Sequence, residues 1–333
     1  MRQHKLIFVL LLAMLFASGL FAQQEAQFTQ NMFNRVFTNP GFSGMGQGIC
    51  VTGFVRQQWA GFKDYEGEKV GPESFLVSID APVRILRGGV SALVMQDQIG
   101  FTKTITLRLG YSYIREVGFG NLGVGAHISF NNRNMDFSKF KPVDQNDPLL
   151  KNITGEQSEI LIDASLGVVY EVPDQYFIGV SVNQLLATKG QELANWTTNV
   201  DSATQGSFLY RMTLDRTYYV QGGYDYVFRR HPNFAILPYA MVKFDKATFQ
   251  LDLAALLEYK QMFWGGLNYR LQDAVSIILG LQYKNFKIGY SYDITTSKLG
   301  LANTAGSHEV MLKYCFKIEA EKGRKSYRNT RFL

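Results

Sequence analysis

The sequence predicts an all-β fold: a transmembrane outer-membrane β-barrel of about 14 antiparallel strands, with a short N-terminal plug or docking segment. Three observations lead to this prediction. The chain begins with an export signal, it contains long segments in which every second residue is apolar, and no apolar run beyond residue 22 could form a membrane helix. A closed barrel is the remaining structure that satisfies every backbone N–H and C=O within a membrane.

Residues 1–22 have the order of regions found in a secretory signal peptide. A positive start containing Arg2 and Lys5 is followed by an apolar run from Leu6 to Phe16, and small residues precede a predicted cleavage after Ala22. A single membrane anchor helix is the alternative, but the run is shorter than the roughly 20 residues that span a bilayer. Neither Cys lies near the cleavage site, which argues against a lipoprotein.

Composition and charge exclude several classes of protein. The 333 residues are 46% hydrophobic and 19% charged, with 8 Pro and 2 Cys, which excludes a disordered, collagen-like or disulfide-scaffold chain. The formal net charge of +6 comes from thinly spread Lys and Arg. We therefore expect a basic solvated surface and no nucleic acid partner.

Four segments show the period-2 alternation of strands most clearly: residues 121–131, 160–171, 247–259 and 274–283. In each, an apolar face lies opposite a face that is mostly small or polar, which predicts one face toward lipid and one toward the lumen. A soluble β-sandwich alternates similarly and is the alternative. Aromatic residues near segment ends, namely Phe130, Tyr170 and Tyr259, are typical of an aromatic girdle.

The predicted strands are long enough to cross a bilayer at a tilt. They lie near residues 48–59, 73–81, 89–98, 102–116, 119–131, 159–171, 174–187, 213–228, 233–245, 247–258, 261–271, 274–284, 285–294 and 307–317. With the N-terminus periplasmic, the odd-numbered connections are extracellular and are allowed to be long. The long connections do fall on that side, at residues 60–72, 132–158, 188–212 and 295–306.

Residues 23–47 form a predicted periplasmic or lumenal segment that is too irregular for a spanning strand. Its apolar spacing predicts a short amphipathic helix that Thr29 caps and Asn39-Pro40 ends. An exposed aromatic stripe needs a partner, so we expect the segment to plug the barrel or dock on another protein, with packing on the barrel's own rim as the alternative. Its partner-docking candidates are Phe28, Met32, Phe33, Asn34, Phe37, Asn39 and Pro40.

Beyond the barrel, which we expect over residues 48–317, residues 318–333 form a basic periplasmic tail. The tail is either a disordered end or a docking peptide. Its docking candidates are Arg324, Lys325, Arg328 and Arg331.

The two cysteines lie on the first and last predicted strands, which barrel closure brings side by side. Cys50 opens the first strand and Cys315 ends the last, and both are expected to point into the lumen near the periplasmic rim. A seam disulfide is therefore a hypothesis, although the shear of a barrel can also separate such residues.

No spacing typical of catalysis or cofactor binding occurs in the sequence. The four His lack zinc-ligand spacing, and hydrolase, phosphate-loop and CxxC motifs are missing. We therefore expect no catalytic residue, no metal and no cofactor. We expect the charged lumenal residues to form a paired packing network rather than a substrate path: Arg56, Arg108, Asp163, Asp252, Glu258 and Glu309.

Several segments resemble the PorP/SprF family of type IX secretion membrane proteins. The strongest likeness is AQFTQNMFNRVFTNPGFSG at residues 26–44, which follows the family's QFSQYMFN…NPAYAG-like opening. It departs from that pattern at Arg35-Val36 and at Gly41-Phe42. Further matches are RQQWAGF (56–62), ISFNNRNMDFS (128–138), GYSYDITTSKL (289–299), GSHEVMLKY (306–314) and the terminal RNTRFL.

This resemblance implies an outer-membrane component of the type IX secretion and gliding machinery of Bacteroidota. The expected partners are outer-membrane lipid, periplasmic ring and translocon proteins, and the C-terminal sorting domains of secreted cargo. Two other functions remain open from the residues: a passive solute channel, and an outer-membrane enzyme.

Overall fold

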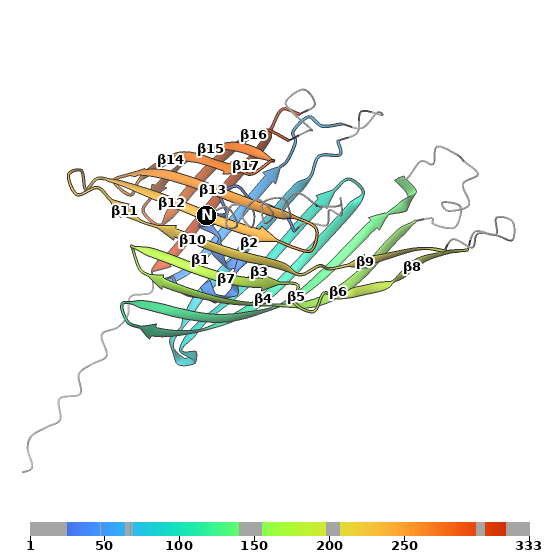
Figure 1. Ribbon diagram of the computed structural model, residues 1–333, viewed down its shortest axis with the longest axis horizontal. Coiled ribbons are helices and arrows are strands. Elements are labelled where there is room, and N and C mark those ends of the chain that lie inside the picture. Colours follow the sequence, from blue (N-terminus) through green and yellow to red (C-terminus); the bar gives the residue numbers. More distant parts are fainter. Residues whose placement is uncertain are drawn as a thin grey trace, which may run out of the picture.

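In a computed structural model, residues 25–46, 48–63, 67, 69–139, 155–197, 207–297 and 304–317 are described. Apart from one separate hairpin, their strands form a closed antiparallel barrel in which each strand pairs with the next barrel strand along the chain (Figure 1). The predicted signal peptide and the predicted basic tail lie outside the described residues.

Fourteen strands form the ring in this part of the chain, once the short strand β11 is counted as a continuation of β10. The ring closes where β10 pairs with β12, and the first strand pairs with the last. The bounds are β1 Gly48–Gln57, β2 Glu73–Val83, β3 Gly88–Ile99, β4 Thr102–Val117, β5 Gly120–Asp136, β6 Glu156–Val172, β7 Tyr176–Asn183, β10 Thr217–Tyr224, β11 Tyr226–Val227, β12 Phe234–Phe244, β13 Phe249–Tyr259, β14 Phe263–Arg270, β15 Ala274–Tyr283, β16 Phe286–Thr295 and β17 Ser307–Lys317.

The interruption between β10 and β11 has a local cause. Tyr218 pairs with Phe244, and Tyr226 pairs with Ile236, so both pieces keep one register on β12. In that register the pairing with β12 is interrupted at Tyr224 and Asp225, opposite Pro238 and Leu237, and Pro238 has no N–H to donate to a ladder. β11 is therefore the end of the same spanning strand.

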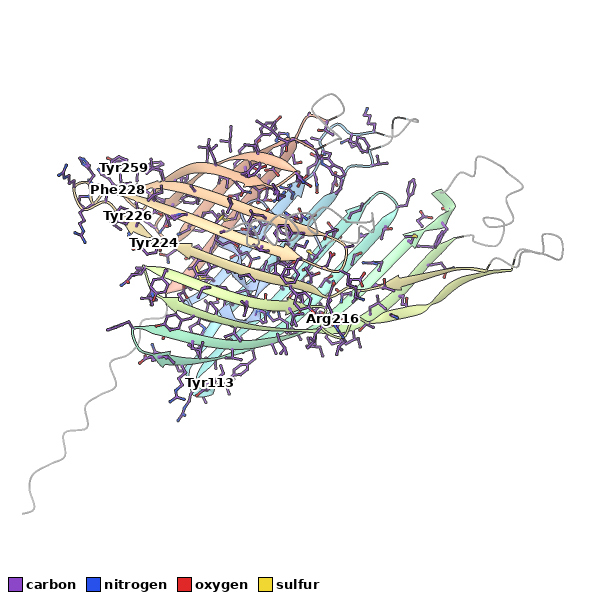
Figure 2. All side chains as sticks on the ribbon, viewed as in Figure 1. Tyr113, Arg216, Tyr224, Tyr226, Phe228 and Tyr259 are labelled. Atoms are coloured by element: carbon purple, nitrogen blue, oxygen red, sulfur yellow. A yellow bond between two sulfur atoms is a disulfide. The ribbon has the colours of Figure 1, made fainter. Side chains whose placement is uncertain are left out.

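The predicted inward and outward faces are confirmed. In β13, Leu253 and Leu257 are exposed on the outer wall, whereas Asp252, Ala254 and Leu256 are buried on the inner one. Tyr224, Tyr226, Phe228 and Tyr259 gather at the end of the barrel that carries the short turns (Figure 2). Since that end is the periplasmic one in bacterial barrels, these rings form part of the expected aromatic girdle.

The connections have the predicted parity, with one correction. The residues between β1 and β2, between β5 and β6, between β7 and β10, and between β16 and β17 form the long connections, and all lie at the same end. The stretch 188–212, which we expected to be a plain connection, contains a hairpin of β8 (Lys189–Thr197) and β9 (Ser207–Thr213). This hairpin is a separate two-stranded sheet. Its strands lack the continuous lipid-facing alternation by which the others were found.

Cys50 and Cys315 are directly paired residues of β1 and β17. The structure joins their sulfur atoms in a disulfide across the seam between the first and last strands. The bond lies close to the end of the barrel that carries the short turns, because β1 begins and β17 ends there.

Because the outer wall faces lipid, a charged substitution on it should destabilise the barrel most near the middle of the membrane. Leu253 is 44% exposed near the middle of β13, so Leu253→Arg places a guanidinium in hydrocarbon. We expect the free energy of unfolding in lipid vesicles, measured by denaturant titration, to fall by about 2–4 kcal/mol. The matched variant Tyr259→Arg, at the strand end, should cost about 0–1 kcal/mol. Equal costs would contradict a membrane-spanning β13.

The seam disulfide predicts a second stability change. Replacing Cys50 and Cys315 with Ser should lower the free energy of unfolding by about 2–4 kcal/mol, because the bond restricts the unfolded chain. A non-reducing peptide map of the wild-type protein should contain the linked pair. Two free thiols in that map would disprove the bond.

Candidate functional site: the plug and the lumenal wall

Residues 25–46 run through the lumen, and we call them the plug. Glu25 lies in the half of the barrel that carries the long connections. Its carboxylate accepts hydrogen bonds from Asn183, the last residue of β7, and from Tyr219 near the start of β10. At the other end, Ser43 bonds Ser91 near the start of β3. The plug thus spans the lumen, and only its C-terminal end lies at the periplasmic rim.

The plug is not the continuous amphipathic helix that its spacing predicts. It contains three short turns, η1 (Asn31–Phe33), α2 (Arg35–Thr38) and η2 (Pro40–Phe42). Thr29 caps no helix; its backbone N–H and hydroxyl donate to the wall instead. No helix in the described part of the chain has the length and apolar character of a membrane span.

A plug with so little internal secondary structure needs hydrogen-bond partners for its backbone, and the wall provides them. The Glu309 carboxylate accepts from the N–H groups of both Thr29 and Gln30, at 2.8 Å each. Carbonyl groups of the plug accept from wall side chains at distances of 2.7–3.1 Å: Glu25 from Lys243, Phe33 from Lys313, Phe37 from Arg108, Thr38 from Ser181 and Gly41 from Ser112.

A buried ion-pair network joins the outer half of the plug to five strands, β1, β13, β14, β16 and β17. Arg56 lies 2.7 Å from Asp293 and 3.1 Å from Glu309, and it also donates to the Thr29 hydroxyl at 2.9 Å. Arg270 extends the network to Asp252, at 3.3 Å. The side chains of these five charged residues are at most 2% exposed. Buried charges persist only when they are paired in this way.

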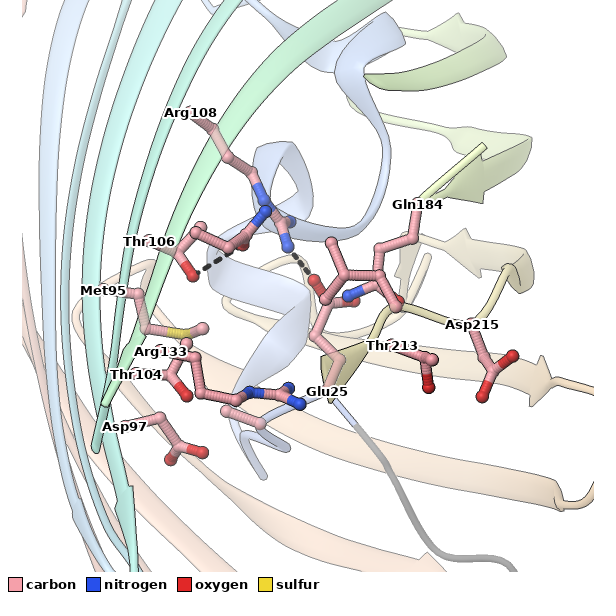
Figure 3. Close-up of a pocket in the computed structure, with 13 residues that line it drawn as sticks. Glu25, Met95, Asp97, Thr104, Thr106, Arg108, Arg133, Gln184, Thr213 and Asp215 are labelled. Carbon is pink, nitrogen blue, oxygen red and sulfur yellow. Dashed lines mark hydrogen bonds and ion pairs between the residues drawn. The ribbon is translucent and has the colours of Figure 1, made fainter. Parts of the chain in front are cut away.

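A second group of contacts, which we call the Glu25 clamp, holds the first described residue of the plug. The Glu25 carboxylate forms an ion pair with Arg108 of β4 (Figure 3). It also accepts a hydrogen bond from the hydroxyl of Tyr219 of β10. Thr104, Asp97 and Arg133 line the space beside this clamp (Figure 3). That cavity has a volume of about 50 Å³.

The periplasmic half of the plug is fixed by an ion pair between Arg35 and Glu171 of β6, at 2.9 Å, and by close backbone approach. Asn39 donates to the carbonyls of Val168 (3.1 Å) and Val180 (3.2 Å) on the paired strands β6 and β7, and its Oδ1 accepts from Gly41 N at 2.8 Å. The wall has glycine at the points of contact. A Cβ on Gly167 would lie 2.1 Å from Asn39 Oδ1, and one on Gly125 would lie 2.4 Å from the Pro40 carbonyl oxygen.

The predicted docking residues of the plug face the wall. Phe28 and Phe37 are each 4% exposed and pack with Phe54 of β1, while Met32 and Phe33 are partly buried against the same cluster. Asn34, Asn39 and Pro40 are buried as well. Of the two roles predicted for the segment, plug and docking surface, the geometry favours the plug. Partner docking through these side chains stays a prediction that would require the plug to move.

The predicted lumenal charges are only partly brought together. Arg56, Asp252 and Glu309 belong to the buried network, and Arg108 holds Glu25. Asp163 has another role, because it accepts from the N–H groups of Leu186 and Thr188 and so anchors the connection after β7. Glu258 lies half-buried, with no ion pair to another described residue.

Sequence reasoning missed three members of these clusters: Glu25, Arg270 and Asp293. Alternation along β14 and β16 puts Arg270 and Asp293 on the inner face, so the signal for both was available. Glu25 had no such signal, because it precedes any periodic segment. The docking candidates of the tail, Arg324, Lys325, Arg328 and Arg331, lie outside the described residues. Within those residues, no cluster of three or more His, Cys, Asp or Glu could hold a metal.

Residues 20–314 match the family described as "Type IX secretion system membrane protein PorP/SprF". Among solved structures, the chain is similar to the CymD monoaromatic hydrocarbon channel, with 12% identity and a TM-score of 0.48, covering 90% of this chain and 96% of that one. It is also similar to the Ralstonia pickettii toluene transporter TbuX, with 13% identity and a TM-score of 0.47, covering 90% and 97%. No curated protein matches the chain.

The ion-pair network predicts a large effect of removing its central cation. Arg56→Met leaves the buried carboxylates of Asp293 and Glu309 without this partner, so we expect the free energy of unfolding to fall by about 3–5 kcal/mol. The matched variant Lys246→Met removes a cation whose side chain is 80% exposed. Its cost should be about 0–1 kcal/mol. Denaturant titration of both variants in detergent compares them, and similar losses would contradict a structural role for the network.

The glycine contacts predict a loosened plug. Gly167→Ala and Gly125→Ala should each lower the free energy of unfolding by about 1–3 kcal/mol through overpacking, and should raise the rate at which protease cuts the plug. Gly53→Ala is the control, because its nearest neighbours are 3.9 Å from the new methyl group. Unchanged protease resistance in both wall variants would show that the plug is not held here.

Proposed function

Because the chain belongs to the PorP/SprF family of type IX secretion membrane proteins, we propose that it is an outer-membrane scaffold for protein export. It assists the export or surface attachment of cargo with a C-terminal sorting domain. Other type IX components are its partners, and we include periplasmic ring and translocon proteins that dock on it. The family is one of membrane barrels rather than enzymes.

The filled lumen is the observation that supports a scaffold most strongly. Two cavities beside the plug have volumes of about 50 and 20 Å³. Clefts that bind small molecules have volumes of about 300–1,000 Å³, so both cavities are small by comparison. A plug held by ion pairs, hydrogen bonds and close backbone contact does not suit free passage of solutes. Binding on the outside of the barrel therefore fits the geometry better than conduction.

The β8–β9 hairpin supports an extracellular binding surface. It projects beyond the ring at the end with the long connections (Figure 1). It pairs with no barrel strand within the described residues, so the barrel wall does not depend on it. We propose that cargo contacts this end, and that periplasmic components contact the opposite end together with the basic tail.

Deletion of the gene tests the secretion role. We expect cargo proteins with the C-terminal sorting domain to be retained in the cells and depleted from the secreted fraction, as measured by quantitative mass spectrometry of both fractions. Re-expression of the wild-type chain should restore export. Unchanged export in the deletion strain would remove the secretion role and leave the barrel intact.

Two further variants test the roles of the two ends of the barrel separately. Replacement of residues 189–213 with a short Gly-Ser linker should reduce cargo export while periplasmic components still co-purify with the barrel. Removal of residues 318–333 should reduce that co-purification. The alternative, a passive solute channel, predicts large steady openings in planar bilayers, whereas a plugged scaffold predicts none.

A further inference from the structure

Two short turns at the periplasmic end carry exposed apolar side chains. The β2–β3 turn, which contains η3 (Arg84–Leu86), exposes Ile85 to 95% and Leu86 to 51%. The β4–β5 turn exposes Phe119 to 96% and Val117 to 44%. Because β3 and β4 are paired neighbours, the two turns lie about two strand spacings, roughly 10 Å, apart. Together they form one apolar patch.

Each turn is tied to the outer face of the next strand by a tyrosine hydroxyl. Tyr111 of β4 donates to the Leu86 carbonyl at 2.6 Å, and Tyr170 of β6 donates to the Val117 carbonyl at 3.1 Å. Both rings lie on the outward faces of their strands, among the residues that contact lipid. The tyrosines therefore hold the turns against the lipid-facing wall, so the patch continues the surface that already contacts the membrane.

Three arginines surround the patch. Arg84 and Arg87 flank Ile85 and Leu86, and Arg115 precedes the β4–β5 turn on the outward face of β4. All three are exposed, and none forms an ion pair with another described residue. The acidic residue in the same turns is Glu116, so the excess charge is positive. A guanidinium group binds a phosphate with two parallel hydrogen bonds.

We propose that these two turns form a binding site for anionic phospholipid in the periplasmic leaflet of the membrane. Ile85, Leu86 and Phe119 lie among the acyl chains, and the arginines bind the headgroup phosphates. An isoleucine and a phenylalanine exposed to this degree need an apolar partner, and lipid adjoins them on the outward wall. The geometry also places basic groups where a negative membrane surface attracts them. This site does not depend on the secretion role.

The depth of the patch is measured by spin labelling. Ile85→Cys and Phe119→Cys proteins carry a nitroxide and are placed in nanodiscs that contain phosphatidylglycerol; the unmutated protein gives the background. We expect both labels to collide more with oxygen than with a water-soluble nickel chelate. A label at Arg230→Cys, on the exposed β11–β12 turn, should show the reverse. Nickel accessibility equal to that of residue 230 would place the patch in water, as a periplasmic protein interface requires, and would overturn the proposal.

The headgroup preference is measured by native mass spectrometry. In nanodiscs with equal phosphatidylglycerol and phosphatidylcholine, we expect the wild-type barrel to retain the anionic lipid preferentially. Arg84→Gln/Arg87→Gln/Arg115→Gln should lose that preference, by about fivefold for each arginine. The matched variant Arg229→Gln/Arg230→Gln/Lys260→Gln removes three cations from other turns of the same end and should keep it. An equal loss in both variants, or no loss in either, would overturn the site. Heat-modifiable gel mobility checks that both variants are folded.

Discussion

A chain segment inside a sealed lumen must find hydrogen-bond partners for its backbone, and this requirement governs the interior of the protein. The plug forms only three short turns, so most of its N–H and C=O groups depend on the wall. The Glu309 carboxylate accepts hydrogen bonds from two consecutive N–H groups of the plug, while lysine, arginine and serine side chains donate to its carbonyls. The polar inner face of the strands is therefore a binding surface for the protein's own N-terminal segment.

The same requirement explains why charge is buried so deeply. A carboxylate that accepts two backbone N–H groups still needs a counter-charge in a region of low dielectric constant, and Arg56 provides it. Arg56 then pairs with Asp293, whose second partner is the hydroxyl of Thr29. Plug and wall thus share one network, and removing Arg56 leaves Glu309 without its ion-pair partner.

Ion pairs hold both halves of the plug. The outer half, from Glu25 to Asn31, depends on ion pairs and hydrogen bonds to carboxylates. The half nearer the periplasm depends on the ion pair between Arg35 and Glu171, on Asn39 and on the close approach of glycine backbones.

Alternation in the sequence determined the strand number, the inner and outer faces and the end that carries the long connections, because a membrane strand must present hydrocarbon on one side and polar groups on the other. Even its exceptions were informative: Leu256 and Ile278 interrupt the polar inner face, and both pack against the plug. Tertiary structure alone decided the path of the plug, its three short turns in place of one helix, and the pairing of Arg56 with Asp293 and of Glu25 with Arg108. Those contacts join residues far apart in the chain, and closure of the ring, not any local pattern, sets which inner faces meet the plug.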